Sequence, residues 1–158
     1  MGLAHWDDVD PHRRAKGEMD ATWQRLGEAA GTKGVGVNLL RVAPGKLPTP
    51  PHSHGASEEV YYVLEGSGLA WQDGRVHEVR AGDCVIQRAA EHVHTFIAGP
   101  EGLEYIVFGT RHPTDFGWLP RSEAVRFGRQ RVEGRVDDPW ECEAESPPLA
   151  YGDQVQPR

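Results

Sequence analysis

The stretch that decides the fold runs from Gly45 to Gly66 and reads GKLPTPPHSHGASEEVYYVLEG. Side chains two positions apart on an extended segment point to the same side, so His52 and His54 project together and could share one metal ion. A carboxylate from the following strand could complete that face. Glu58 and Glu59 are the candidates, and only one of them can point inward because neighbours on a strand face opposite ways. The residues alone therefore indicate a metal site and leave its carboxylate open.

The sequence around this stretch is typical of short β-strands separated by Gly, Pro and Asp. Asp73-Gly74 supplies the positive φ angles that a tight hairpin turn requires. About eight short strands with no amphipathic helix between them favour an all-β fold, either an antiparallel sandwich or a barrel. The expected strands lie near residues 35–43, 52–54, 58–65, 68–71, 75–79, 84–88, 92–98 and 103–109.

Two further segments flank the expected barrel, which occupies residues 34–110. Residues 1–33 are an irregular N-terminal extension, in which a short helix is expected from about Asp20 to Ala30 because Asp20 can cap it. Residues 111–158 are rich in proline, which breaks long elements. We expect this last segment to be an arm that packs on the barrel or on a partner subunit.

Length and charge limit the classes of partner. The 158 residues fit one domain of ordinary size. Seventeen basic and 24 acidic residues give a formal net charge of −7, which repels phosphate backbones, so we expect no nucleic-acid partner. No apolar stretch approaches the length of a membrane span, so we expect no membrane partner. The N-terminus has neither the basic nor the apolar part of a signal peptide, and we expect a cytoplasmic protein.

From Gly45 to Gly66 the sequence resembles the first motif of the cupin superfamily. That motif reads Gly, five residues, His-x-His, three or four residues, Glu, six residues, Gly. Here four residues separate His54 from Glu59 and six separate Glu59 from Gly66. The resemblance therefore selects Glu59 as the ligand, although six residues rather than five precede His52. It also implies the fold of the family, a double-stranded β-helix or jelly-roll barrel.

The second cupin motif is matched only in part. It reads Gly, five residues, Pro-x-Gly, two residues, His, three residues, Asn. Gly82-Asp83 opens the motif well. Arg88 then stands where the family has Pro, Ala90 where it has Gly, and Val93 falls on the counted histidine position. Counting forward therefore does not identify the fourth ligand.

Two histidines flank the counted position. His92 and His94 would point to the same side of a strand, so spacing alone leaves both open. Counting back from the turn at residues 99–102 places Ala98 on the family's Asn and selects His94, with one residue inserted in the preceding loop. The resemblance thus implies the metal ligands His52, His54, Glu59 and His94, with His92 as the alternative to His94.

Such a ligand set would hold one divalent metal ion per chain, and it does not decide between Fe, Mn, Ni and Zn. Three imidazoles and one carboxylate would leave an octahedral ion two open positions, which suit a small ligand that chelates through two oxygens. Tyr61 and Phe96 are expected on the ligand face, where they would line a pocket or simply pack in the core. The sequence assigns no catalytic acid or base.

The cupin superfamily includes dioxygenases, isomerases, decarboxylases, storage proteins and sensor domains, so resemblance to it predicts the fold better than the reaction. We expect a metal-dependent enzyme that acts on a small oxygenated metabolite, with a dioxygenase as the leading subtype. The alternative is a non-catalytic metal- and ligand-binding protein of a sensing or storage kind. We also expect a homodimer, because Val60, Tyr62 and Leu64 present apolar side chains on the outer face and similar cupins commonly pair in this way.

Overall fold

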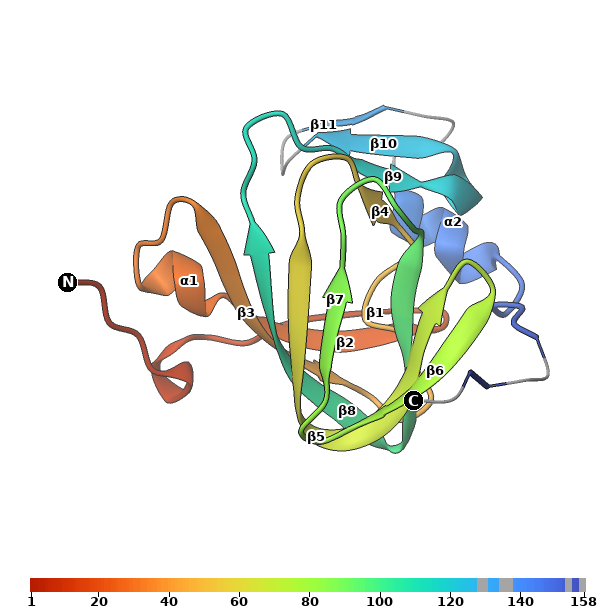
Figure 1. The fold of residues 1–158 in the computed structure, drawn as a ribbon, viewed down its shortest axis with the longest axis horizontal. Coiled ribbons are helices and arrows are strands. Elements are labelled where there is room, and N and C mark those ends of the chain that lie inside the picture. The colour runs from red at the N-terminus through yellow and green to blue at the C-terminus, as the bar shows by residue number, and fades with distance from the viewer. Residues whose placement is uncertain (128–130, 134–137, 153–154, 157–158) are drawn as a thin grey trace.

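The strands of the computed structural model, which describes residues 1–127, 131–133, 138–152 and 155–156, form two antiparallel sheets (Figure 1). The larger sheet has the order β1-β2-β3-β8-β5-β6, with β7 paired to β5. Its strands are β1 (His12–Lys16), β2 (Met19–Gln24), β3 (Val35–Val42), β5 (Glu59–Gln72), β6 (Arg75–Arg80), β7 (Cys84–Gln87) and β8 (His94–Thr110).

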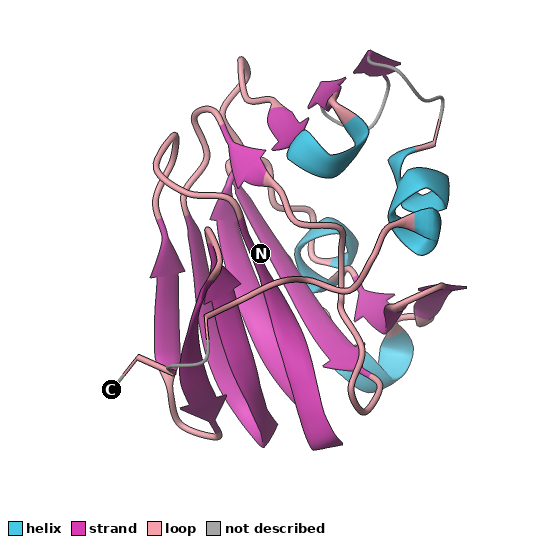
Figure 2. Cartoon of the chain, turned by 90° about the vertical axis from the view of Figure 1, so that its right-hand side faces the viewer, coloured by secondary structure: helices cyan, strands magenta, loops and turns pink. Residues whose placement is uncertain are grey.

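The smaller sheet has the order β11-β10-β9-β4 and covers one end of the larger one (Figure 1). Figure 2 shows the long strands as one curved layer, with the small sheet and the helices beside it. The remaining elements are β4 (Ser53–His54), β9 (Gly117–Leu119), β10 (Ala124–Phe127), β11 (Arg131–Glu133), the α-helices α1 (Leu26–Ala29) and α2 (Pro139–Glu145), and the 3-10 turns Trp6–Asp8 and Pro120–Ser122. The expected all-β jelly-roll class is therefore confirmed.

The concave face of the large sheet holds the core. Along β5 the side chains alternate, so that Tyr61 and Val63 are buried while Tyr62 is 45% exposed. Cross-strand partners continue the inner rows: Tyr61 lies opposite Val107, and Val63 lies opposite Tyr105. The buried core comprises Ala21, Leu40, Val42, Tyr61, Val63, Ala70, Val79, Phe96, Ala98, Leu103, Tyr105 and Val107.

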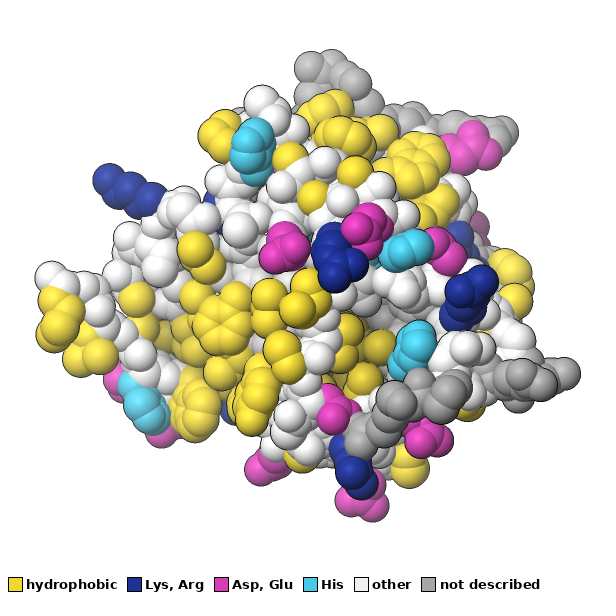
Figure 3. Space-filling view, in the orientation of Figure 1, with side chains coloured by type: hydrophobic (Ala, Val, Ile, Leu, Met, Phe, Trp, Pro, Cys, Tyr) yellow, Lys and Arg dark blue, Asp and Glu magenta, His cyan; other side chains and the backbone are white. Residues whose placement is uncertain are grey.

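The outer face of the same strands is apolar and partly uncovered. Tyr62, Ile86 and Phe108 are 45%, 52% and 41% exposed. Val60 joins them into one patch, because it lies opposite Ile86 on β7 and opposite Phe108 on β8. Figure 3 shows apolar side chains gathered over these front strands.

One predicted turn is confirmed, and a second glycine is required by close packing. Asp73 and Gly74 have φ angles of 48° and 82° and join β5 to β6 as the predicted tight hairpin. Gly66, which closes the first motif, has a φ of 75°, and a Cβ there would lie 2.2 Å from the carbonyl oxygen of Gly102. A side chain at this position would therefore collide with the backbone of β8.

Several expected boundaries were wrong. The strands expected at 58–65 and 68–71 are the single strand β5, and those expected at 92–98 and 103–109 are the single strand β8. The pairing of β5 with β8 shifts register between residues 63 and 68, so β5 continues through Gly66 and Gly68. The helix expected from Asp20 to Ala30 is strand β2 followed by the four-residue helix α1. The N-terminal segment thus contributes two strands to the large sheet.

The C-terminal segment forms β9, β10, β11 and α2, so it contains more regular structure than the extended arm that we expected. Its last described part contacts the barrel: Gly152 donates a backbone hydrogen bond to Gly74 (3.1 Å), and Gln156 donates one to Val76 (2.8 Å). Residues 128–130, 134–137, 153–154 and 157–158 of this segment lie outside the described residues. No helix in the described part of the chain is long and apolar enough to cross a membrane.

Candidate metal centre

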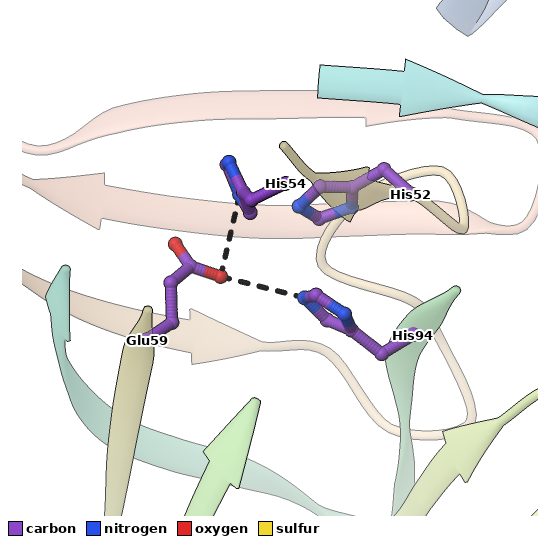
Figure 4. Close-up of side chains that lie close together, drawn as sticks. All are labelled: His52, His54, Glu59 and His94. Carbon is purple, nitrogen blue, oxygen red and sulfur yellow. Dashed lines mark hydrogen bonds and ion pairs between the residues drawn. The ribbon is translucent and has the colours of Figure 1, made fainter. Parts of the chain in front are cut away.

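The structure brings His52, His54, Glu59 and His94 together at the end of the barrel that the small sheet covers (Figure 4). His54 belongs to β4, whereas Glu59 and His94 are the first residues of β5 and β8. His52 and His94 exchange two backbone hydrogen bonds, of 3.1 and 2.8 Å, which fix these two positions relative to each other. One potential ligand atom from each of the four residues lies within 4.8 Å of all the others.

The three imidazoles are anchored through their outer nitrogens. Nδ1 of His52 lies 2.9 Å from the carbonyl oxygen of Pro50, and Nδ1 of His94 lies 3.2 Å from that of His92. Nδ1 of His54 lies 2.9 Å from Oδ2 of Asp115. Because carbonyl and carboxylate oxygens only accept, each contact places a proton on Nδ1 and leaves the Nε2 lone pair for an ion.

The donor set fits a divalent metal ion. Nε2 of His54 is buried and has no hydrogen-bond partner among the described residues. Glu59 Oε2 lies 3.5 Å from that atom and 3.4 Å from Nε2 of His94. A buried polar atom without a partner is costly unless something completes it. An ion held between these nitrogens and the carboxylate would do so.

The charges of the four groups are strongly coupled. Burial lowers the pKa of His52 to about 3, and the neighbouring histidines add to the effect. Burial also opposes the charge of His54, but Glu59 and Asp115 overcome it and raise the pKa of His54 to about 9. Burial by itself would raise the pKa of Glu59, yet His54 and His94 hold that pKa well below its usual range. When no ion is bound, the second proton on His54 makes its ring positive between the carboxylates of Glu59 and Asp115. Binding of a cation would release that proton.

Asp115 is a functional residue that sequence reasoning missed. It lies in the loop after β8, and its Oδ1 accepts hydrogen bonds from the backbone amides of Ala56 (2.8 Å) and Ser57 (3.1 Å). Its Oδ2 holds His54. One carboxylate thus fixes both the loop that follows β4 and the orientation of one imidazole. No spacing rule marks this residue in the sequence.

His92 lies apart from the group. Its Nδ1 is 2.7 Å from Oδ2 of Asp73, and the backbone amide of Val93 also donates to Asp73. His92 therefore ties the loop before β8 to the β5–β6 hairpin. Glu58 is exposed, and its backbone amide donates to Thr110.

A small chamber inside the barrel is lined by three of the four residues, His52, Glu59 and His94. Its volume is about 100 Å³, and its walls include Asn38, Thr49, Tyr61, Phe96 and Tyr105. Both residues expected to line a pocket, Tyr61 and Phe96, therefore do so while also belonging to the core. A volume of this size holds about three water molecules, because each occupies about 30 Å³ in the liquid.

Two tyrosines face this chamber. The hydroxyl of Tyr61 donates a hydrogen bond to Oε2 of Glu59. Burial, together with the negative charge of Glu59, raises the pKa of Tyr61 and of Tyr105 well above the usual value.

A wider vestibule of about 1180 Å³ leads to the chamber. The two spaces are continuous, because they share five lining residues: Trp23, Asn38, Thr49, Glu59 and Val107. A bound molecule of moderate size could therefore place a few atoms beside the four candidate metal-binding residues, with its remaining atoms in the vestibule.

The fold and this cluster define a jelly-roll barrel with a candidate centre of three histidines and one glutamate. The family model of the cupin domain matches residues 38–109. Residues 38–109 thus match the cupin domain, and the chain is similar in fold to solved cupin structures.

Individual relatives differ in activity. The chain is 34% identical over 88 residues to the dimethylsulfoniopropionate lyase DddW of Ruegeria pomeroyi, covering 54% of this chain and 56% of that protein. An uncharacterized protein of Methanocaldococcus jannaschii is 43% identical over 54 residues, which are 34% of this chain and 43% of that protein. The chain thus spans about half the length of the curated relatives that it matches.

Solved structures of cupins match over more of the chain. A sugar phosphate isomerase from the cupin superfamily of Silicibacter pomeroyi has a TM-score of 0.69 at 26% identity, covering 78% of this chain and 84% of that one. The polyketide cyclase RemF of Streptomyces resistomycificus has a TM-score of 0.63 at 25% identity, covering 89% and 91%.

Proposed function

We propose that this protein is a metal-dependent enzyme that acts by proton transfer on a small oxygenated metabolite bound through the ion. One observation carries the proposal: three imidazoles and one carboxylate converge beside a small chamber that two tyrosines line. A non-catalytic metal-binding protein needs the metal-coordinating residues, but it does not need buried tyrosine hydroxyls beside them.

The residues divide the work between them. A divalent ion held by His52, His54, Glu59 and His94 would supply Lewis acidity toward a bound carbonyl or carboxylate oxygen. The hydroxyl of Tyr61 contacts Glu59 and holds a proton at Oη beside the site. Tyr105 offers a second hydroxyl on the same chamber wall. Phe96, which is 1% exposed, helps to keep bulk water from the reacting atoms.

The relatives support proton transfer over oxidation. The matched proteins are named a lyase, an isomerase and a cyclase, and such reactions can run by moving protons within one substrate. A dioxygenase, the leading subtype predicted from the sequence, remains a prediction that the same experiment tests. The non-catalytic alternative is also an outcome of that experiment.

The test loads the purified chain separately with Fe(II), Mn(II), Ni(II) and Zn(II), with Fe(II) handled anaerobically. Each form is incubated in D₂O with a panel of keto acids, hydroxy acids and diols, and proton NMR follows exchange of carbon-bound hydrogen and the formation of products. An oxygen electrode runs in parallel with the same compounds. We expect exchange or turnover that requires metal and consumes no oxygen.

Tyr61→Phe is the informative variant, and Tyr62→Phe is its matched control on the outer face of the same strand. Loss of a proton-transfer group lowers rates by about 10²–10⁴-fold, so Tyr61→Phe should lose at least about a hundredfold while retaining bound metal. Oxygen uptake coupled to substrate loss would identify a dioxygenase instead. Compounds that raise the melting temperature of only the loaded protein, with no turnover by any form, would favour the non-catalytic binding protein.

A further inference from the structure

The vestibule carries positive charge in a protein whose net charge is −7. Four arginines line it, against the three acidic residues Glu28, Glu59 and Asp115. Glu59 and Asp115 both contact His54. The four arginines are Arg14, Arg25, Arg111 and Arg126.

Three of these arginines differ in their carboxylate partners. Arg14 contacts both carboxylate oxygens of Asp138 at 3.0 Å and lies over the ring of Trp140. Arg25 lies 3.9 Å from Glu28. In the described part of the chain, no carboxylate lies within ion-pair distance of Arg111. Its backbone is held nevertheless, because its amide donates to the carbonyl oxygen of Gly34 at 3.0 Å.

The side chains of Arg111 and Glu59 lie near neighbouring positions of one row that crosses three strands. Glu59 is opposite Gly109, and Gly109 is opposite Gly36, which makes one row across β5, β8 and β3. A Cβ built on Gly109 would lie 3.5 Å from Oε1 of Glu59, and one built on Gly36 would lie 3.4 Å from Nε of Arg111. Because Cβ positions of directly opposed residues are about 4.5–5.5 Å apart, Nε lies at most about 12 Å from the Glu59 carboxylate.

The row of two glycines leaves the space between these groups open. A Cβ at Gly36 would reach van der Waals contact with the guanidinium, and one at Gly109 would reach van der Waals contact with Glu59. The guanidinium therefore lies beside the vestibule, within about 12 Å of the Glu59 carboxylate. Guanidinium groups bind carboxylates and phosphates through paired hydrogen bonds.

We propose that the substrate of this site carries a second anionic group, a carboxylate or a phosphate, which Arg111 binds while its chelating oxygens occupy the metal centre. The proposal rests on the proposed function and extends it to a substrate class. The chelating end fits a chamber of about 100 Å³ and is therefore a few atoms in size. The anionic tail stays in the vestibule, on the Gly36–Gly109 side.

The experiment compares two matched pairs of probes by calorimetry on the chain loaded with Zn(II), which has no redox chemistry. The first pair is 2-oxoglutarate and 2-oxopentanoate, which differ only in the distal carboxylate. The second pair is 3-phosphoglycerate and glycerate, which differ in the phosphate. We expect the more highly charged member of at least one pair to bind about tenfold more tightly, and the preferred pair identifies the anionic group.

Variants attribute that preference to its residue. Arg111→Gln should reduce the ratio of the two dissociation constants to near one, and Arg111→Lys should retain part of it. Arg75→Gln, an exposed arginine on β6 outside the vestibule, should leave the ratio unchanged. The ratio is informative because general damage to the site would weaken both members of a pair alike.

The outcomes separate the two proposals. Equal binding of both members of each pair, or a preference that survives Arg111→Gln, overturns the role of Arg111 and leaves the chelating metal site standing. If no probe binds the loaded protein, the proposed function fails, and this inference fails with it.

Discussion

Replacing Glu143 by Gln should remove a pH-dependent loss of stability that helix α2 imposes on the fold. The side chain of Glu143 is 3% exposed, and its carboxylate lies 2.8 Å from Nη1 of Arg121. Burial raises the pKa of Glu143 from 4.5 to about 7, because the loss of hydration outweighs the attraction of Arg121. The folded chain therefore keeps a proton that the unfolded chain releases near pH 4.5.

The sign follows from that difference. Between about pH 4.5 and 7 the folded state binds more protons than the unfolded state, so the free energy of unfolding falls as the pH rises. Below this range the group costs nothing. Above it, the full cost of ionising a buried carboxyl is at most about 3 kcal/mol, because each unit of pKa difference is about 1.4 kcal/mol.

Urea unfolding of the wild-type chain and Glu143→Gln, followed by circular dichroism at pH 5, 6, 7 and 8 with a chelator present, measures the effect. The variant should be more stable by less than about 1 kcal/mol at pH 5 and by up to about 3 kcal/mol at pH 8. Glu141→Gln is the matched control, since Glu141 lies on the same helix with its side chain 60% exposed. A Glu143→Gln variant that is less stable than wild type at pH 8 would refute the reasoning. It would mean that the attraction between Glu143 and Arg121 outweighs the cost of burying the carboxylate.

Three further predictions concern the site and the surface. His94→Ala should abolish metal binding and His92→Ala should spare it, as measured by elemental analysis after loading; the reverse result would move the fourth ligand to His92. Asp115→Asn should weaken metal binding by about 10–100-fold in a competition assay. An amide nitrogen opposite Nδ1 of His54 favours the tautomer whose Nε2 carries the proton and cannot bind the ion. Unchanged affinity would contradict the anchoring role of Asp115. Finally, the wild-type chain should be a homodimer through the exposed apolar patch of Tyr62, Ile86 and Phe108, and Ile86→Asp should dissociate it. A mass of 17.5 kDa for the wild-type chain in light scattering would count against the dimer.

The part of the site whose residues lie close together in the sequence could be predicted from it. His52, His54 and Glu59 fall within eight residues, and strand periodicity alone places two of them on one side. The choice of Glu59 over Glu58 and of His94 over His92 needed the resemblance to a family. Spacing along a strand does not show whether Glu58 or Glu59 points inward. It also does not show which of His92 and His94, which share one side, lies near the other ligands.

Asp115 and Arg111 could not be found in this way. Each follows β8 in the chain and reaches the site only because β8 pairs with both β3 and β5. The helix expected from Asp20 failed for a related reason. Met19 and Ala21 are buried alternately along β2, a period of two that is typical of a strand, and pairing with β3 overrides the local helical pattern.

The backbone pair between His52 and His94 has a consequence for how the protein would acquire its ion. Two of the three imidazoles lie at positions that amide–carbonyl bonds hold, so we expect the chain to reorganise little when an ion enters or leaves. Replacement of one metal by another would then be governed by ligand exchange rather than by refolding. For such a site the metal found in the cell follows local supply and the general affinity order of divalent ions more than any choice made by the barrel. Protein purified from different growth media should therefore differ in metal content while sharing one fold.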